Sequence, residues 1–175
     1  ARVLELGAGT GIVGLAAAAA GAEVLMTDHE PLLPLMRLNA DLNRELLAGS
    51  PPVDCAAFDW QQPPPDAVRR PWDLIIAADL VYAFAAVAPF ADALAAVLVG
   101  APGRPAFAPR AVYAHNPRSD DLDAELRRAL AAKGLRAVPF DFRAWRAEPV
   151  GRIGAEALQR VAMMEIAPAP HEGAP

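Results

Sequence analysis

The sequence is poor in the residues on which several functional classes depend. It contains one cysteine, Cys55, which excludes an intrachain disulfide and makes a reducing compartment the default expectation. The three histidines are scattered and form no Cys/His cluster with metal-ligand spacing, so we expect no bound metal. The net charge of −5 lacks the basic excess typical of nucleic-acid-binding proteins. No apolar run is long and hydrophobic enough to span a bilayer, so we expect no membrane span.

What is present is an apolar chain of single-domain length. With 175 residues, of which 54% are hydrophobic, the sequence can bury a core and does not resemble a disordered chain. We expect one domain over residues 1–166 and a disordered tail over 167–175. We also expect a monomer that is cytoplasmic or, as an alternative, nuclear. The chain begins at Ala1 on an apolar segment without an initiator methionine, so we expect further sequence before Ala1 in the complete protein.

Strand-like and helix-like segments alternate along the chain, which is typical of a doubly wound α/β fold with helices on both faces of the sheet. Strands are predicted at residues 2–6, 23–27, 53–58, 73–78, within 106–114, at 135–140 and at 161–166; helices are predicted at 10–20, 31–48, 89–99 and 120–133. Pro109 cannot donate to a central strand ladder, which favours a start of the fifth strand at Arg110. Ser119 is predicted to cap the helix that follows it.

A glycine-rich turn follows the first predicted strand. Gly9-x-Gly11-x-x-Gly14 formally satisfies the dinucleotide fingerprint, but the strand ends near Leu6, so the turn at its tip is Gly7-x-Gly9-x-Gly11. In that register the third glycine comes too early for a dinucleotide site. An acid-x-Gly-x-Gly-x-Gly pattern, led here by Glu5, is typical of methyltransferases that bind S-adenosylmethionine. The alternative is a plain tight turn between a strand and a helix.

Three more segments place polar or aromatic residues at predicted strand ends. Asp28 closes the second strand, where nucleotide folds place the carboxylate that accepts the ribose hydroxyls; the alternative is that Asp28 starts the loop or caps the next helix. After the third strand, Trp60 could stack on a purine and Asp59 could reach its exocyclic amine; the alternative is a tryptophan that anchors the proline-rich loop. Asp79 and Tyr82 follow the fourth strand and would flank the reactive end of a cofactor; the alternative is a capping Asp and a half-buried Tyr.

The segments LELGAGTG at 4–11, TD at 27–28, FDW at 58–60 and ADLVY at 78–82 occur in an order and spacing that resemble one enzyme family. They resemble the seven-β-strand protein lysine methyltransferases (methyltransferase family 16), which modify chaperones, calmodulin and elongation factors. The resemblance covers about residues 2–98. It implies a Rossmann-like, mostly parallel seven-stranded sheet with an antiparallel last strand, S-adenosylmethionine as cofactor, and a protein substrate such as a chaperone or translation factor.

The resemblance also implies roles for individual residues. Glu5 leads the glycine motif, and Gly7, Ala8 and Gly9 approach the methionine part of the cofactor. Asp28 binds its ribose, Asp59 and Trp60 lie by the adenine, and Ala78 contributes a backbone contact. Asp79 and Tyr82 shape the lysine entrance and are the predicted catalytic residues.

Three rival functions stay open. The first is methylation of a small molecule on the same fold, and the second is a non-catalytic binding module. The third is an NAD-dependent oxidoreductase, against which the register of the glycines argues. Nucleobase methylation is disfavoured because the fourth-strand motif lacks the two central prolines of base-directed enzymes.

Overall fold

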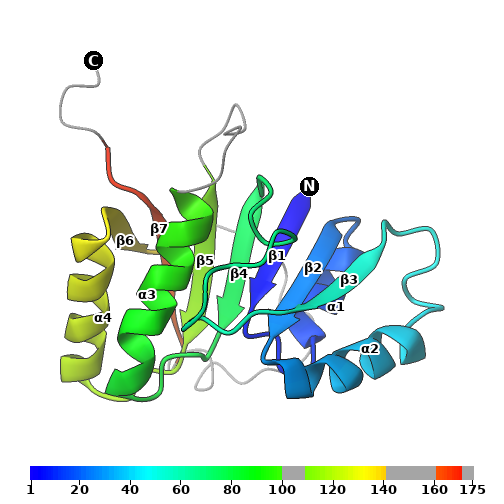
Figure 1. Cartoon of the computed structure of the whole chain (residues 1–175), viewed down its shortest axis with the longest axis horizontal. Coiled ribbons are helices and arrows are strands. Elements are labelled where there is room, and N and C mark those ends of the chain that lie inside the picture. Colours follow the sequence, from blue (N-terminus) through cyan, green and yellow to red (C-terminus); the bar gives the residue numbers. More distant parts are fainter. Residues whose placement is uncertain (100–108, 141–160, 171–175) are drawn as a thin grey trace.

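The computed structural model describes residues 1–99, 109–140 and 161–170, and these form a seven-stranded sheet. The strands lie in the order β3-β2-β1-β4-β5-β7-β6 (Figure 1). Their bounds are β1 Arg2–Leu6, β2 Glu23–Asp28, β3 Val53–Ala57, β4 Leu74–Ala78, β5 Arg110–His115, β6 Leu135–Pro139 and β7 Ala162–Pro168. β7 runs antiparallel to both neighbours, whereas the pairs among β1 to β5 are parallel. The predicted mostly parallel sheet with an antiparallel last strand is confirmed.

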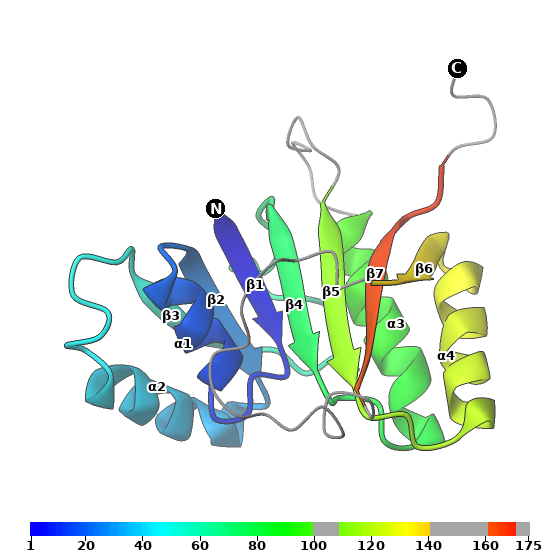
Figure 2. The ribbon, with the colours of Figure 1, turned by 180° about the vertical axis from the view of Figure 1, so that it is seen from behind.

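Helices cover both faces of this sheet. Helices α3 (Phe84–Leu98) and α4 (Asp120–Ala132) pack on one face, and α1 (Ile12–Ala19) and α2 (Leu33–Leu42) lie on the other, as the two opposite views show (Figures 1 and 2). A short 3₁₀ helix, η1 (Glu30–Leu32), precedes α2. The larger apolar core lies under α3 and α4, and a smaller one lies under α1 and α2. No helix in the described ranges is long and apolar enough to cross a membrane.

Two predicted helices have different bounds in the structure. The helix predicted at 31–48 is wrong at both ends. Its first residues belong to η1, so α2 begins at Leu33. α2 ends at Leu42 because Asn43 closes the last helical turn, and turns follow up to Gly49. The helix predicted to start at Pro89 starts at Phe84 instead. Proline favours the first turn of a helix, but Val87 lies only 2% exposed in the core, so the preceding apolar turn is recruited into α3.

The remaining boundaries agree more closely with the sequence. β5 begins at Arg110, so Pro109 stays outside the ladder, and the Ser119 hydroxyl caps α4 by accepting from Leu122 N at 3.2 Å. β7 continues through Pro168, two residues beyond the predicted end of the domain, because Ala167 and Pro168 still pair with β6. The connection at 141–160 and the end of the predicted tail at 171–175 lie outside the described residues.

Because β1 to β5 are parallel, their carboxyl ends meet at one edge of the sheet, the lower edge in Figure 1. In open α/β sheets, ligands bind in the crevice beyond this edge, where the strand order reverses. Here the order reverses between β1 and β4, so the loops after these two strands define the place to look for a site.

Candidate functional site

A cavity of about 730 Å³ opens at the carboxyl edge of the sheet. All ten residues predicted from the sequence to form the site line it: Glu5, Gly7, Ala8, Gly9, Asp28, Asp59, Trp60, Ala78, Asp79 and Tyr82. They come from the ends of four strands that are far apart in the sequence. The fold therefore brings the predicted residues together, while the role of each one stays a prediction.

The glycine turn forms the floor of this cavity. Gly7, Gly9 and Gly11 have φ values of 63°, 56° and 81°, a left-handed region that favours glycine. The turn is tied to β2 by the N–H of Ala8, which donates to the Thr27 carbonyl at 2.9 Å. A Cβ added to Gly7 would overlap the side chain of Leu80, so this glycine also lets the loop after β4 pack against the turn.

Glu5 is buried beneath the start of α1, with only 2% of its surface exposed. Gly11, the N-cap residue of α1, offers no capping side chain, and the Glu5 carboxylate instead accepts the Gly14 N–H at 3.0 Å. A Cβ on Gly14 would overlap that carboxylate, so glycine is required for the approach. Burial raises the pKa of Glu5 to about 7; the hydrogen bond from Gly14 opposes this rise and the charge of Asp28 adds to it.

Asp28 links the glycine turn to the segment after β2. One of its carboxylate oxygens accepts the Gly9 N–H at 2.7 Å and the other accepts the His29 N–H at 2.7 Å. The N-cap of η1 is His29, so Asp28 does not cap that helix, while the alternative that Asp28 starts the loop after β2 stays open. Each oxygen keeps a lone pair for a further donor, such as a hydroxyl group. The position suits a carboxylate that receives a ligand at the end of β2.

Trp60 forms the wall of the cavity next to β3. Its ring packs against Phe90 of α3 with centroids 5.4 Å apart and planes tilted by 49°. The neighbouring Asp59 accepts the Gln61 N–H at 2.9 Å, which holds the turn after β3. Trp60 is therefore held by the core on one side and lines the cavity on the other. This arrangement is compatible with stacking on a purine and also with anchoring the proline-rich loop.

The segment after β4 presents Asp79 and Tyr82 at the mouth of the cavity. Asp79 has a φ of 52°, a conformation that few residues other than glycine adopt, and its N–H donates to the Ala114 carbonyl at 2.8 Å. The N-cap of α3 is Ala83, so Asp79 does not cap that helix. Tyr82 is 69% exposed, so the alternative of a half-buried tyrosine is also wrong. The side chain of Tyr82 is available to a ligand, and that of Asp79 is 54% exposed.

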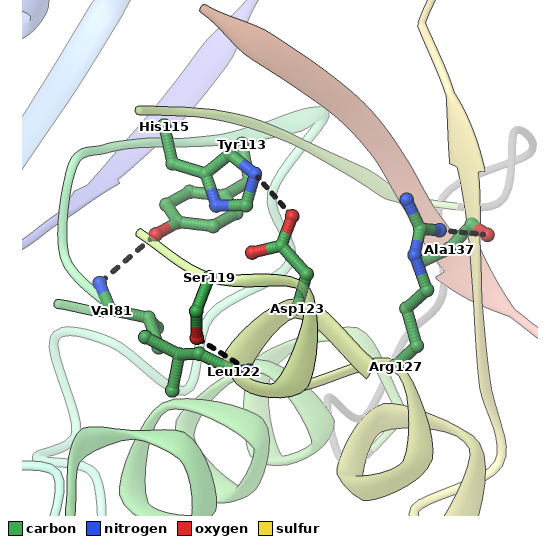
Figure 3. A network of polar contacts seen from close by, with 8 residues as sticks. All are labelled: Val81, Tyr113, His115, Ser119, Leu122, Asp123, Arg127 and Ala137. Atoms are coloured by element: carbon green, nitrogen blue, oxygen red, sulfur yellow. Dashed lines mark hydrogen bonds and ion pairs between the residues drawn. The ribbon is translucent and has the colours of Figure 1, made fainter. Parts of the chain in front are cut away.

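Sequence reasoning missed the residues of β5 and its following loop that hold this segment. The Tyr113 hydroxyl accepts the Val81 N–H at 2.9 Å (Figure 3). His115 packs edge-on against Tyr113 with centroids 4.9 Å apart, and its Nε2 lies 3.7 Å from a carboxylate oxygen of Asp123. Burial lowers the pKa of His115, and the charge of Asp123 opposes that shift. Alternation along β5 could have placed Tyr113 and His115 on the buried face.

Arg118 is the second residue that the sequence did not reveal. Its guanidinium Nη2 lies 3.0 Å and 2.9 Å from the two carboxylate oxygens of Asp79. The two residues are 39 positions apart, and no local motif marks the arginine. Arg118 contacts Asp79 but does not itself belong to the described lining of the cavity, whose acidic groups are Glu5, Asp28, Asp59 and Asp79, with His29 beside them. The described part of the lining thus offers carboxylates and no lysine or arginine.

Comparison with known proteins shows which family this chain resembles. The model of a family described as lysine methyltransferase matches residues 1–111. The protein-lysine N-methyltransferase rrg1 of Schizosaccharomyces pombe is 44% identical over 90 residues, which are 46% of this chain and 29% of that protein. The protein N-lysine methyltransferase METTL21A of Danio rerio is 40% identical over 82 residues, or 46% of this chain and 37% of that protein.

A third relative and a solved structure extend the comparison. The EEF1A lysine methyltransferase 3 of Xenopus tropicalis is 36% identical over 84 residues, or 46% of this chain and 34% of that protein. The matches to these relatives thus span well under half of their length. The structure of the CcbJ methyltransferase from Streptomyces caelestis has a TM-score of 0.65 and 17% identity, and the match covers 97% of this chain and 84% of that one. At this identity it supports the fold alone.

Proposed function

The chain belongs to the lysine methyltransferase family, and we propose that it transfers a methyl group from S-adenosylmethionine to the ε-amino group of a lysine in a protein substrate. The observation that carries this proposal is the convergence of all ten predicted residues on one cavity at the carboxyl edge of the sheet. The cavity volume lies in the range of small-molecule and cofactor sites. Membership of the lysine methyltransferase family then supports methyl transfer to lysine as the reaction at this site.

The lining fits S-adenosylmethionine better than a dinucleotide. Asp28 can accept the ribose hydroxyls, Trp60 offers a face to the adenine, and the turn at Gly7 to Gly9 lets the methionine part approach the backbone. S-adenosylmethionine carries a positive sulfonium and an ammonium group, which acidic walls favour. A dinucleotide carries an anionic pyrophosphate, and the described lining contains no lysine or arginine to receive it. The charge of the cavity therefore adds to the glycine register as an argument against NAD.

The residues at the mouth are placed to handle the substrate amine. When bound, S-adenosylmethionine supplies an electrophilic methyl group. A lysine ammonium has no free lone pair, so it must release its proton to water before its nitrogen can attack, and desolvation at the mouth favours that release. The new N–C bond forms as the S–C bond of the donor breaks, and S-adenosylhomocysteine leaves as a neutral thioether. Asp79 is placed to orient the amine and Tyr82 to wall the channel, so that the nitrogen is held in line with the methyl group. No strong base is required for this chemistry.

Cofactor binding tests the first half of the proposal. Calorimetry should show S-adenosylmethionine binding to the protein, with affinity reduced about tenfold to a hundredfold in Asp28→Asn, because a charge-assisted hydrogen bond is lost. The matched control is Asp54→Asn, whose exposed side chain lies on β3 away from the cavity. Absence of cofactor binding in the wild-type protein would favour a non-catalytic binding module. Equal affinity in Asp28→Asn would remove Asp28 from the ribose site.

Product identity tests the second half. Protein of a cell extract is incubated with the enzyme and methyl-labelled S-adenosylmethionine, then hydrolysed to amino acids. We expect the label in methyl-lysine. Label in another amino acid would contradict the lysine assignment, and turnover with metabolites but not with protein would favour the small-molecule methyltransferase.

We further propose a monomer in the cytoplasm, with the nucleus as the alternative, that acts on a chaperone or a translation factor. The name of the EEF1A methyltransferase relative supports the translation-factor class of substrate. A single cysteine is compatible with a reducing compartment. Light scattering and the localisation of a tagged protein in cells would test the monomer and the compartment.

A further inference from the structure

Arg118 is the basic residue that meets the predicted lysine entrance. It lies in the segment between β5 and α4, directly before the N-cap Ser119, and its Nη2 contacts both carboxylate oxygens of Asp79. The backbone of Asp79 is held by its hydrogen bond to Ala114. Both partners of the ion pair are therefore attached to fixed points of the fold, one at the end of β4 and the other at the start of α4.

The pair is exposed enough to exchange partners. The side chain of Asp79 is 54% exposed and that of Arg118 is 41% exposed. Exposed ion pairs contribute little to stability, so opening this one costs little. A substrate lysine is a cation of the same class as Arg118 and arrives at the same carboxylate. The two cations must therefore either compete for Asp79 or share it.

The charges around the pair decide which protonation state the incoming lysine has. Acidic groups face the cavity from three other strand ends, namely Glu5, Asp28 and Asp59. Further titratable groups come from the segment after β4, from β5 and from α4; these are Tyr82, Tyr113, His115 and Asp123. His29 also lines the cavity, and the charge of Arg127 acts on His115. Arg118 supplies the positive charge that contacts Asp79, and burial favours the neutral form of His115. Without Arg118, Asp79 would meet the lysine as an unpaired carboxylate and would hold it as an ammonium.

Building on the proposed lysine methylation, we propose that Arg118 is a positioning residue that neutralises Asp79, weakens binding of the unreactive ammonium and lets the target lysine react at a lower pH. The physical basis is electrostatic. A positive charge about 5 Å from an amine disfavours the ammonium, and the effect is reduced by solvent and salt at an exposed site. We expect the reacting lysine to lose its proton about half a unit to one unit lower in pH than it would beside an unpaired Asp79.

The first measurement is binding, which requires no catalysis. Nα-acetyl-L-lysine amide is titrated at pH 7 into the protein saturated with S-adenosylhomocysteine, and binding is followed by NMR. Arg118→Gln should bind this ammonium about threefold to tenfold more tightly than wild type. This factor is the expected pKa shift of about half a unit to one unit, expressed as a ratio of affinities. Arg118→Lys keeps the charge and should resemble wild type. Arg128→Gln removes a charge paired with Glu125 on the exposed side of α4 and serves as the matched control.

The second measurement is the pH profile of single-turnover methylation of extract protein, read as labelled methyl-lysine. The rate in Arg118→Gln should reach half its maximum about half a unit to one unit higher in pH than in wild type, with no such shift in Arg118→Lys or Arg128→Gln. A purely structural role for Arg118 would lower the rate at every pH without moving the profile.

The two measurements separate failure of this inference from failure of the proposed function. Unchanged affinity for the lysine amide in Arg118→Gln, or no binding by any variant, would overturn the inference, as would Arg118→Lys behaving like Arg118→Gln. If wild type forms no methyl-lysine while Arg118→Gln still gains affinity for the amide, lysine methylation fails and the competition at Asp79 stands.

Discussion

The buried Glu5 makes the stability of the protein depend on pH in a way that one substitution should abolish. Glu5 is 2% exposed, and its carboxylate accepts the Gly14 N–H where α1 begins. Glu5→Gln has nearly the same shape and keeps a carbonyl oxygen that can accept this hydrogen bond, but it cannot ionise. The difference between the two proteins therefore isolates the cost of burying the charge.

The size of the effect follows from the pKa of Glu5, which burial raises from 4.5 to about 7. A raised pKa in the folded state means that the folded protein binds the proton more tightly than the unfolded chain does. The resulting stability is fully present below about pH 4.5 and is lost as the pH rises through 7. The shift corresponds to about 3 kcal/mol of unfolding free energy.

Urea denaturation of both proteins at several pH values between 4.5 and 8 measures this dependence. The unfolding free energy of wild type minus that of Glu5→Gln should fall by about 3 kcal/mol across the range. Glu30→Gln, which removes an exposed carboxylate of η1 outside the core, is the control. A flat difference for Glu5→Gln would refute the reasoning, because it would mean that the buried carboxylate ionises at its ordinary pH.

Three further substitutions test contacts that hold the site, all by urea denaturation. Gly14→Ala should destabilise the protein by about 1–3 kcal/mol, because its Cβ would lie 2.7 Å from Met26 Cγ; an unchanged midpoint would show that α1 can shift. Ser119→Ala should cost about 1 kcal/mol by removing the cap of α4, whereas Ser50→Ala, at a serine that caps no helix, should not. Tyr113→Phe should cost about 1–3 kcal/mol by leaving the Val81 N–H without its acceptor; full stability would show that water replaces the hydroxyl.

The sheet and the membership of the site could be predicted because both depend on short stretches of sequence. Val3, Leu4 and Leu6 are apolar and buried, as is Glu5 between them, so the apolar residues identify β1 as a central strand. The site residues follow strand ends directly, and parallel strands place their ends at one edge. Local pattern, one topological rule and the resemblance to the methyltransferase family together predicted the residues that line the cavity.

The helix boundaries and the supporting contacts could not be predicted, because they depend on residues distant in the sequence. Pro89 suggested a helix start, but packing of the turn before it against the core extends α3 to Phe84. The contact between Arg118 and Asp79 joins residues 39 positions apart, and that between Tyr113 and Val81 joins residues 32 apart. Such contacts are set by the packing of β5 beside β4, which no local motif encodes.

The central claim is that Asp79 acts on a lysine beside bound S-adenosylmethionine. Asp79→Asn is the sharpest variant, because asparagine tolerates the left-handed backbone at this position and removes only the charge. Single-turnover formation of labelled methyl-lysine should fall about tenfold to a hundredfold, while calorimetry shows cofactor affinity within about threefold of wild type. Asp66→Asn, at a fully exposed carboxylate, should match wild type. An Asp79→Asn enzyme that forms methyl-lysine at the wild-type rate would contradict the account.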